Sequence, residues 1–588
     1  MKRRTLLGLV PVLPLARAAA PAAALLGTTP VDVVAATRAS WPSSSQWDAL
    51  ARRVDGRLFA VNSPFVDCAS GNGGACSALF QRLRNPYFIR DDPALTQTLG
   101  WVDAWESAPS VYAVTPTHSL HVAAAVNFAR RHRLRLVVKG GGHSYLGTSS
   151  AANSLLVWTR DMHDIVVHDA FVPQGCAGAN AAPAVSVGAG AIWMHVYEAV
   201  SSRGGRYVQG GGCATVGVAG HVQSGGFGSF SKRFGTSSSN LLEAEVVTAD
   251  GRVRVVNACR DADLFFSLRG GGGGTFGVVT RVTLRTHPLP ATFGAVFGTI
   301  QVRSDAAFHA LIASFLGFYR DRLLDPHWGE IVSLLPDRRL RVTMLFQGLD
   351  ERGARKVWEP FIDQLRTMHD VAIREPFTFA VVPARNFWDP AYLRQHVPNA
   401  IVADDRAGAS PSDVYWSADA AQAGQYLHGY TSTWLPASLL DERNVRTLAD
   451  ALFGASRHWT VGLHFNKGLA GAPKDVIEAA AQTAMNPVAL RSFALAIVAA
   501  EGPPAHSDVR GHEPDLVRAR SEARRVRDAT FALRRAVPDP GSYVAESDYF
   551  EADWGRAFWG GHYPRLRAVK ARHDPQRLFS VHHGVGSE

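Results

Sequence analysis

The amino-acid sequence predicts an α+β protein built from two large domains and a C-terminal segment. Between residues 106 and 289, short apolar strands and helical segments alternate with three glycine-dense loops, an arrangement suited to closing backbone N–H groups around phosphates or an aromatic ring. Between residues 290 and 540, strand-like runs alternate with long helices, which predicts an antiparallel sheet backed by helices. The 588 residues, 46% hydrophobic and 19% charged, suffice for two or three cores.

The first 26 residues have the pattern of an export signal. Lys2, Arg3 and Arg4 precede a short apolar run that ends in small residues between positions 16 and 20. The Arg3-Arg4 pair also fits twin-arginine export, and the sequence leaves the Sec and twin-arginine routes open. The run is too short and too proline-broken to span a membrane stably. We therefore expect a secreted or periplasmic protein in which residues 27–105 form an N-terminal extension of mixed helix and loop.

Five cysteines remain to be assigned. Cys68 and Cys76 flank a short Gly/Asn/Ala/Ser loop, which in an exported protein predicts a disulfide. Cys176 and Cys259 either pair with each other or stay buried as small apolar groups. Cys213 is then the odd thiol. Because the sequence has no CxxC motif and no histidines at metal-ligand spacing, no metal site is expected.

The net charge of +10 does not point to a nucleic-acid partner. Basic residues are spread along the chain, and only the helical-looking segment 521–535 is dense in them. A solvated helix face explains that segment better than a nucleic-acid patch does. No other segment approaches a membrane-spanning run, so we expect neither a nucleic-acid nor a membrane partner.

Each glycine loop follows a predicted strand or helix. The first loop, KGGGHSY, follows a predicted strand over 111–116, a helix over 118–133 and a strand over 134–140. This order is the start of a phosphate-holding βαβ unit. A helix over 192–204 precedes GGGCATVGVAGH, and the Asp250-Gly251 turn predicts a hairpin after it. The third loop, RGGGGGTFGVVT, leads into the last strands, which end near Pro288. Three such loops in one domain indicate a large nucleotide-type cofactor.

Four motifs in order resemble the berberine-bridge-enzyme-like branch of the vanillyl-alcohol-oxidase flavoproteins. They are KGGGHSY, GGGCATVGVAGH, DLFFSLRGGGGGTFGVVT and the tail YVAESD…WGGHYPRLRAVKARHDPQRLF. The resemblance covers residues 110–288 and 541–584. It implies a two-lobed, PCMH-type FAD-binding domain over 106–289, a substrate-binding domain over 290–540, and a berberine-bridge-like segment over 541–588 that returns to the FAD domain.

The resemblance also implies FAD attached by two covalent bonds. The family joins the histidine of its first motif to the flavin 8α-methyl group and the cysteine of its second motif to flavin C6, which here are His143 and Cys213. A nucleophilic nitrogen and a thiolate adding to an electron-poor ring need no base beyond the site itself. Without the resemblance, the two residues would be interpreted as a turn histidine and a buried small apolar group. The expected cofactor contacts are Lys139, Gly140, Gly141, Gly142, His143, Ser144, Gly212, Cys213, Thr215, Gly217, His221, Gly225, Gly226, Gly277, Val279 and His562.

Four residues are expected to act in catalysis. Tyr145 matches a family tyrosine that faces the substrate. His221 matches a histidine near the flavin pyrimidine edge, where a positive or hydrogen-bonding group stabilises the reduced anion. Val216 matches a small gate residue that admits dioxygen, which favours an oxidase over a dehydrogenase. Glu546 is a candidate general base, because a carboxylate beside a flavin in an apolar pocket can have a raised pKa.

The sequence departs from the family pattern at several positions. Phe227 replaces a common tyrosine, and YVAE replaces Tyr-x-Asn-Tyr in the tail, so the usual tyrosine base is missing and Glu546 stands in its place. The alternative for Glu546 is a surface or salt-bridged side chain. His562 replaces an asparagine that contacts the cofactor. His464 and Asn466, two apart on a predicted strand, either share the pocket face or belong to the core.

The resemblance therefore predicts an exported oxidase with bicovalent FAD. It would oxidise a small molecule such as a sugar, a phenol or a secondary metabolite by hydride transfer to flavin N5, with Glu546 or Tyr145 as base, and reduce dioxygen to hydrogen peroxide. A dehydrogenase or oxidative cyclase of the same fold is the first alternative, and a flavin-free secreted binding protein is the second. The sequence leaves the substrate and the oligomeric state open.

Overall fold

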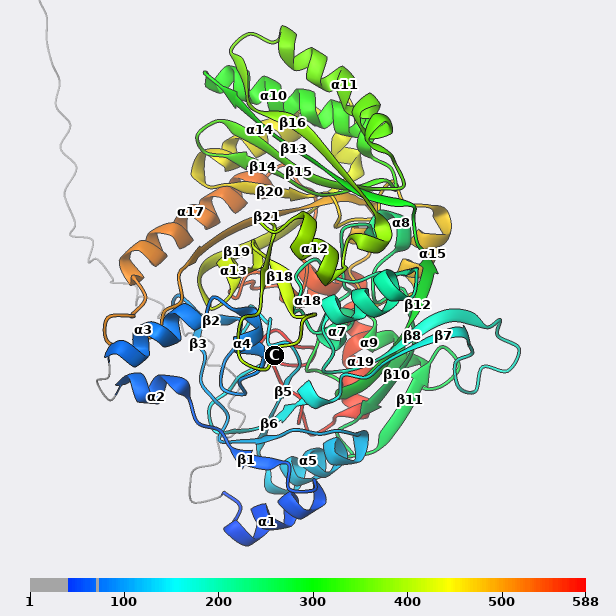
Figure 1. Ribbon diagram of the computed structural model, residues 1–588, viewed down its shortest axis with the longest axis vertical. Helices are drawn as coiled ribbons and strands as arrows, with labels where there is room; N and C mark the ends of the chain where they lie inside the picture. The colour runs from blue at the N-terminus through cyan, green and yellow to red at the C-terminus, as the bar shows by residue number, and fades with distance from the viewer. Residues whose placement is uncertain (1–40, 70–72) are drawn as a thin grey trace, which may run out of the picture.

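The computed structural model describes residues 41–69 and 73–588, so the predicted export signal lies outside the described residues. The described strands form four sheets, and helices flank the larger ones, which confirms the α+β class. In Figure 1 the domain with α10 (Asp305–Phe318) and α11 (Glu351–Thr367) lies above the glycine-loop domain with α5 (Ser119–His132). Within the described ranges, no helix is long and apolar enough to cross a membrane.

The first lobe of the glycine-loop domain is a four-stranded sheet. Its order is β1 (Leu58–Ala60), β4 (Tyr112–Val114), β6 (Ser154–Trp158) and β5 (Arg135–Lys139). β4, β6 and β5 run parallel, and α5 makes the crossover from β4 to β5. The apolar side of α5 forms a buried cluster with this sheet. The first glycine loop starts at the carboxyl end of β5, the end of a parallel strand at which α/β folds bind ligands.

The second lobe is an antiparallel sheet of five strands in the order β11-β10-β12-β8-β7, with β9 paired to the end of β12. Residues 247 and 253 are opposite each other beside the Asp250-Gly251 turn, which confirms the predicted hairpin. Gly251 has φ +75°, a conformation that glycine adopts without steric cost. The bounds are β7 (Ile165–Phe171), β8 (Ala182–Gly188), β9 (Arg206–Val208), β10 (Leu241–Val247), β11 (Val253–Asn257) and β12 (Val278–Pro288).

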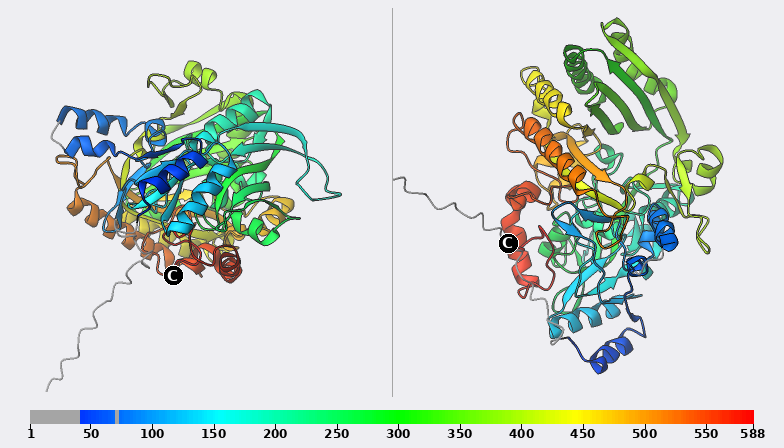
Figure 2. Two further views of the ribbon diagram at one scale, coloured as in Figure 1. Left: turned by 90° about the horizontal axis from the view of Figure 1, so that it is seen from below. Right: turned by 90° about the vertical axis from the view of Figure 1, so that its left-hand side faces the viewer.

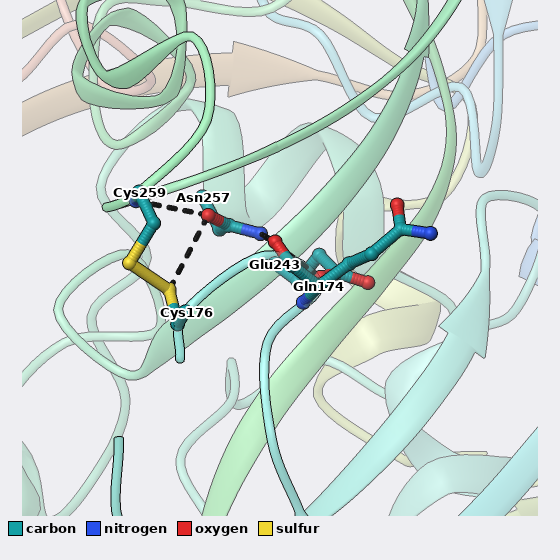
Figure 3. Close-up of a disulfide and its surroundings, with 5 residues drawn as sticks. All are labelled: Gln174, Cys176, Glu243, Asn257 and Cys259. Atoms are coloured by element: carbon teal, nitrogen blue, oxygen red, sulfur yellow. Dashed lines mark hydrogen bonds between the residues drawn. A yellow bond between two sulfur atoms is a disulfide. The ribbon is translucent and has the colours of Figure 1, made fainter. Parts of the chain in front are cut away.

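Both disulfides that the cysteine spacing allows are formed, Cys68–Cys76 and Cys176–Cys259. The second joins the β7–β8 loop to the turn after β11 (Figure 3). Asn257, which is fully buried, supports it: its Oδ1 accepts from the Cys259 N–H (2.9 Å), and its Nδ2 donates to the Gln174 carbonyl (2.9 Å). Cys176 is therefore paired rather than a free apolar group.

We expect the double variant Cys176→Ser/Cys259→Ser to lower the free energy of unfolding. The disulfide closes a loop of 83 residues, for which the loop-entropy model gives about 4.5 kcal/mol. Urea unfolding at fixed FAD concentration measures the loss. A loss below about 1 kcal/mol would show that the loop stays restricted in the unfolded chain without the bond.

The second domain is a nine-stranded, mostly antiparallel sheet in the order β16-β13-β15-β14-β20-β21-β19-β2-β3. The helices α10, α11, α14 (Val445–His458) and α17 (Leu516–Arg534) bury their apolar sides with the sheet in one cluster, and Figure 2 shows them on the outer side of the sheet. The strands are β13 (Thr292–Val302), β14 (Trp328–Leu335), β15 (Arg339–Gln347), β16 (Val371–Pro383), β19 (Gln425–Pro436), β20 (Val461–His464) and β21 (Ser492–Gly502).

The last two strands of this sheet come from the N-terminal extension. β2 (Thr98–Trp101) pairs in parallel with β19, and β3 (Trp105–Glu106) continues the edge. The sequence predicted only helix and loop here. A four-residue strand whose partner lies more than 300 residues away leaves no local periodicity to detect.

The C-terminal segment returns to the glycine-loop domain, as expected. α18 (Trp554–Trp559) places the Trp559 indole N–H on the Gly270 carbonyl at 2.9 Å. α19 (Tyr563–His573) packs on α9 (Ala262–Leu268), and its Lys570 donates to the Thr275 carbonyl at 2.7 Å. The tail therefore fixes the third glycine loop from behind.

Candidate active site

The three glycine loops meet at a cavity of about 440 Å³ that lies between the two domains. The nine-stranded sheet contributes residues from β14, β19 and the end of β20, and the C-terminal segment closes the cavity with residues around 543–546 and 581–584. The volume is within the range of small-molecule and cofactor sites. All three glycine motifs and the tail motif therefore serve one site.

Two of the glycine loops are in direct backbone contact. A Cβ atom built on Gly141 would lie 2.7 Å from the Gly217 nitrogen, and one built on Gly217 would lie 2.7 Å from the Gly141 nitrogen. Any other residue at either position would push the loops apart. This contact brings His143 on the first loop and Cys213 on the second to the same cavity.

His143 lines the cavity and forms a hydrogen bond between its Nε2 atom and Thr215 Oγ1 at 2.9 Å. Burial lowers the pKa of His143 to about 4. The imidazole is therefore neutral at pH 7 and keeps a lone pair, which is the nucleophilic form of the ring.

Cys213 is the one cysteine in the described ranges that is not in a disulfide. Burial raises the pKa of its thiol well above the ordinary value, and the charge of Asp419 raises it further. The Asp419 carboxylate accepts a hydrogen bond from the Ala214 N–H at 3.0 Å, which places it beside Cys213. Burial raises the pKa of Asp419 itself to about 6.

His221 also lines the cavity, but both of its ring nitrogens have protein partners. Nε2 donates to the Phe227 carbonyl at 3.0 Å, and Nδ1 lies 3.2 Å from the Ser237 hydroxyl. Burial lowers its pKa to about 4, so the ring is neutral at pH 7. Of the two expected roles, a positive or a hydrogen-bonding group, the neutral ring leaves only the second, and its N–H is already taken by the Phe227 carbonyl of the same loop.

The positive charge in the cavity comes from Lys467 instead. Its ammonium group forms a salt bridge with Glu546, and both side chains are largely buried. Glu546 is therefore salt-bridged, as in the alternative interpretation, and it also lines the cavity.

A second carboxylate, Glu330, lies in the same cavity on β14. It accepts from the Ser229 hydroxyl and from Asn466 Nδ2, the latter at 3.2 Å. Burial raises its pKa. Its backbone has φ +66°, a left-handed conformation that costs a non-glycine residue about 1 kcal/mol or more and is concentrated at functional sites.

Two tyrosines face the Lys467–Glu546 pair. Tyr145 and Tyr430 line the cavity with ring centroids 4.8 Å apart. Burial raises the pKa of both phenols well above 10, and the charge of Glu546 raises each further. Both therefore stay neutral and can donate hydrogen bonds at neutral pH.

The lining fits a large polar cofactor such as FAD. Four buried polar atoms on its wall have no hydrogen-bond partner within the described part of the chain, and Cβ atoms built on three of its glycines would meet only open space. The polar atoms are Gln223 Oε1, Thr275 Oγ1, Asn466 Oδ1 and His583 Nδ1, and the glycines are Gly212, Gly220 and Gly273. Buried polar atoms without partners are rare in native proteins, so a ligand that hydrogen-bonds to them is expected.

Most of the residues predicted from sequence lie on the cavity wall. They are Gly140, Gly141, Gly142, His143, Ser144, Tyr145, Gly212, Cys213, Val216, Gly217, His221, Gly277, Val279 and Glu546, together with His464 and Asn466. Five predicted cofactor contacts do not line it: Lys139, Thr215, Gly225, Gly226 and His562.

These five residues support the wall from behind. The buried Lys139 ammonium donates to the Asp92 and Leu95 carbonyls at 2.5 and 2.6 Å. Thr215 contacts His143, and His562 Nδ1 donates to the Met485 carbonyl at 3.0 Å. Gly225 and Gly226 form a turn with φ +109° and +75° behind Phe227. A motif residue is close in sequence to the residues that line the cavity. Packing decides whether its own side chain also points into the cavity.

Sequence reasoning missed Lys467, Tyr430, Glu330 and Asp419. All four come from the substrate domain, where no motif was recognised. Lys467 offered one usable signal, since it directly follows Asn466, which was predicted to lie on one strand with His464. β20 ends at His464, so strand alternation extends to neither Asn466 nor Lys467.

A histidine and a cysteine at the meeting point of three glycine loops, with the Lys467–Glu546 pair in the same cavity, fit a flavin-type cofactor enzyme. Comparisons with known proteins agree. Residues 110–257 match the family described as "FAD binding domain", and residues 542–586 match "Berberine and berberine like".

The chain is 30% identical to the FAD-linked oxidoreductase easE of Arthroderma otae, covering 93% of this chain and 88% of that protein. It is 27% identical to the VAO-type flavoprotein oxidase VAO615 of Thermothelomyces thermophilus, covering 94% and 92%. The crystal structure of the VAO-type flavoprotein MtVAO615 from Myceliophthora thermophila superposes with a TM-score of 0.75 at 24% identity, over 94% of this chain and 96% of that chain. The protein therefore belongs to the berberine-bridge-enzyme-like, VAO-type FAD-linked oxidoreductases.

A more distant neighbour is a glucooligosaccharide oxidase of Acremonium strictum, with a TM-score of 0.63 at 18% identity over 84% of this chain and 94% of that chain. That oxidase is described with a 6-S-cysteinyl, 8α-N1-histidyl FAD. At this identity the likeness shows the shared fold.

Proposed function

We propose that the protein is an exported oxidase that carries FAD on His143 and Cys213 and oxidises an alcohol- or amine-type small molecule. The observation that carries the proposal is the meeting of these two nucleophiles, 70 residues apart in sequence, at one cavity with the Lys467–Glu546 pair. The doubly linked FAD named for the glucooligosaccharide oxidase supports the same attachment here.

The three glycine loops and the tail would hold the FAD, and His143 and Cys213 would anchor its ring system. The bound flavin would supply the redox chemistry, taking a hydride from the substrate and passing the electrons to dioxygen with release of hydrogen peroxide. Val216 lines the cavity beside Cys213, in accord with the proposed dioxygen gate. Two disulfides agree with folding in an oxidising compartment.

The chain's own part in the reaction is to take the proton from the substrate. Of the two candidate bases, Tyr145 is held as a neutral phenol, whereas Glu546 forms a salt bridge with Lys467. We assign the proton to a Glu546 carboxylate oxygen, and we assign Tyr145 and Tyr430 to orienting the substrate hydroxyl or amine by hydrogen bonds. The apolar parts of the wall exclude water from this step.

The visible spectrum of the purified protein, followed by a screen for oxygen consumption and peroxide formation, tests the proposal. Sugars, oligosaccharides, phenols and indole-type amines form the substrate panel. We expect a yellow protein whose substrate-reduced form is reoxidised in air. Slow reoxidation in air with fast reoxidation by a dye would show a dehydrogenase instead, and a colourless, well-folded protein would reject the flavoenzyme.

A further inference from the structure

Asp419 is a half-buried carboxylate of the substrate domain that lies against the second glycine loop. It starts α13 (Asp419–Gln422), just after β18 (Val414–Trp416). Two hydrogen bonds tie this segment to the loop on either side of Cys213: Trp416 Nε1 donates to the Gly212 carbonyl at 3.1 Å, and the Ala214 N–H donates to Asp419 Oδ2 at 3.0 Å. The carboxylate is thereby fixed beside Cys213, close enough for its charge to act on the thiol.

Asp419 has no cationic partner among residues 41–69 and 73–588. The neighbouring acids do: Asp404 pairs with Arg406, and Asp413 with His195. A carboxylate of this chain that faces a thiol rather than a cation is free to accept a proton.

We propose that Asp419 is the general base for attachment of the flavin to Cys213. The inference rests on the proposed bicovalent flavin and names the residue that makes one of its bonds possible. Asp419 takes the thiol proton of Cys213, and the sulfur forms a thioether bond to a flavin ring carbon in place of a ring hydrogen. That hydrogen leaves as a proton, and the two electrons released pass to dioxygen, which is reduced to hydrogen peroxide.

The surroundings of Cys213 make a base necessary. The thiolate is the nucleophilic form of cysteine. Burial and the nearby carboxylates Asp419 and Glu546 keep the thiol protonated at neutral pH, and Lys467 only partly opposes them. Asp419 is itself mostly ionised at pH 7, so it can take the proton as the carbon–sulfur bond forms.

The test uses the full-length chain produced under flavin-limited conditions and then given FAD in air. Mass spectrometry follows the flavin adducts on the Cys213 and His143 peptides with time. We expect Asp419→Asn to slow the Cys213 adduct at least about 10-fold, with the His143 adduct forming at the wild-type rate. Asp405→Asn, which removes an exposed acid from the same segment, is the matched control, and Asp419→Glu should restore part of the rate.

A second measurement separates a base from a packing residue. Below a pH of about 6 Asp419 is protonated and cannot accept the thiol proton, so the wild-type rate of Cys213 adduct formation should fall there, and Asp419→Asn should lack this transition. Equal adduct rates in wild type and Asp419→Asn would overturn the inference. If the wild-type protein acquires FAD but no Cys213 adduct, the proposed attachment itself fails.

Discussion

We expect Glu546→Gln to lower kcat about 10²- to 10⁴-fold while leaving the amount of bound flavin unchanged. The substitution keeps the shape of the side chain but removes the carboxylate that we assign as proton acceptor. The rate of flavin reduction by the best substrate from the screen, measured anaerobically by stopped flow, is the direct readout, because it does not depend on dioxygen. Tyr145→Phe should lose about 10-fold or less, since a neutral phenol orients the substrate without accepting its proton.

The control for this prediction is the double variant Glu546→Gln/Lys467→Met. Glu546→Gln leaves the buried Lys467 ammonium without its partner, and an unpaired buried charge can disturb a site by itself. If that disturbance caused the loss, removing the charge as well would restore the rate. If Glu546 is the base, the double variant stays slow. A larger loss in Tyr145→Phe than in Glu546→Gln would make the tyrosine the base.

We expect wild-type protein to keep its yellow colour in an acid pellet. His143→Ala and Cys213→Ala should each keep the colour through the remaining covalent bond. The double variant His143→Ala/Cys213→Ala should release all of it. The double variant should still bind FAD without a bond, because the polar wall of the cavity is intact. Its thermal midpoint should then rise with added FAD, as mass action requires for a dissociable ligand, whereas the wild-type midpoint should not.

His562→Ala is the matched control for these variants. This histidine lies outside the cavity wall and donates to the Met485 carbonyl, so its loss should leave the acid pellet coloured. Release of all colour from wild-type protein by acid would show FAD held without covalent bonds. Release from Cys213→Ala alone would assign the attachment to cysteine only.

The sequence predicted the site well where contiguous residues carry the chemistry. The three glycine loops, the two nucleophiles and the tail motif all meet at one cavity. Glycine is required where backbones touch, as at Gly141 and Gly217, and this requirement is local enough to be recognised in the sequence. The βαβ start and the Asp250-Gly251 hairpin were predictable for the same reason.

The tertiary structure decided what depends on distant segments. Sequence alone could not foresee that Lys467 pairs with Glu546, 79 residues away, that Asp419 faces Cys213, or that the His221 N–H is taken by the Phe227 carbonyl. Nor could it foresee the added strands β2 and β3, or choose between the two states of Cys176 and Cys259. The sequence by itself determined the class of cofactor and pointed to the two nucleophiles that we propose as its anchors, because motif residues act through their own chemistry. Charge, proton acceptance and partner choice were decided by packing, because each is a property of two side chains that only the folded chain brings together.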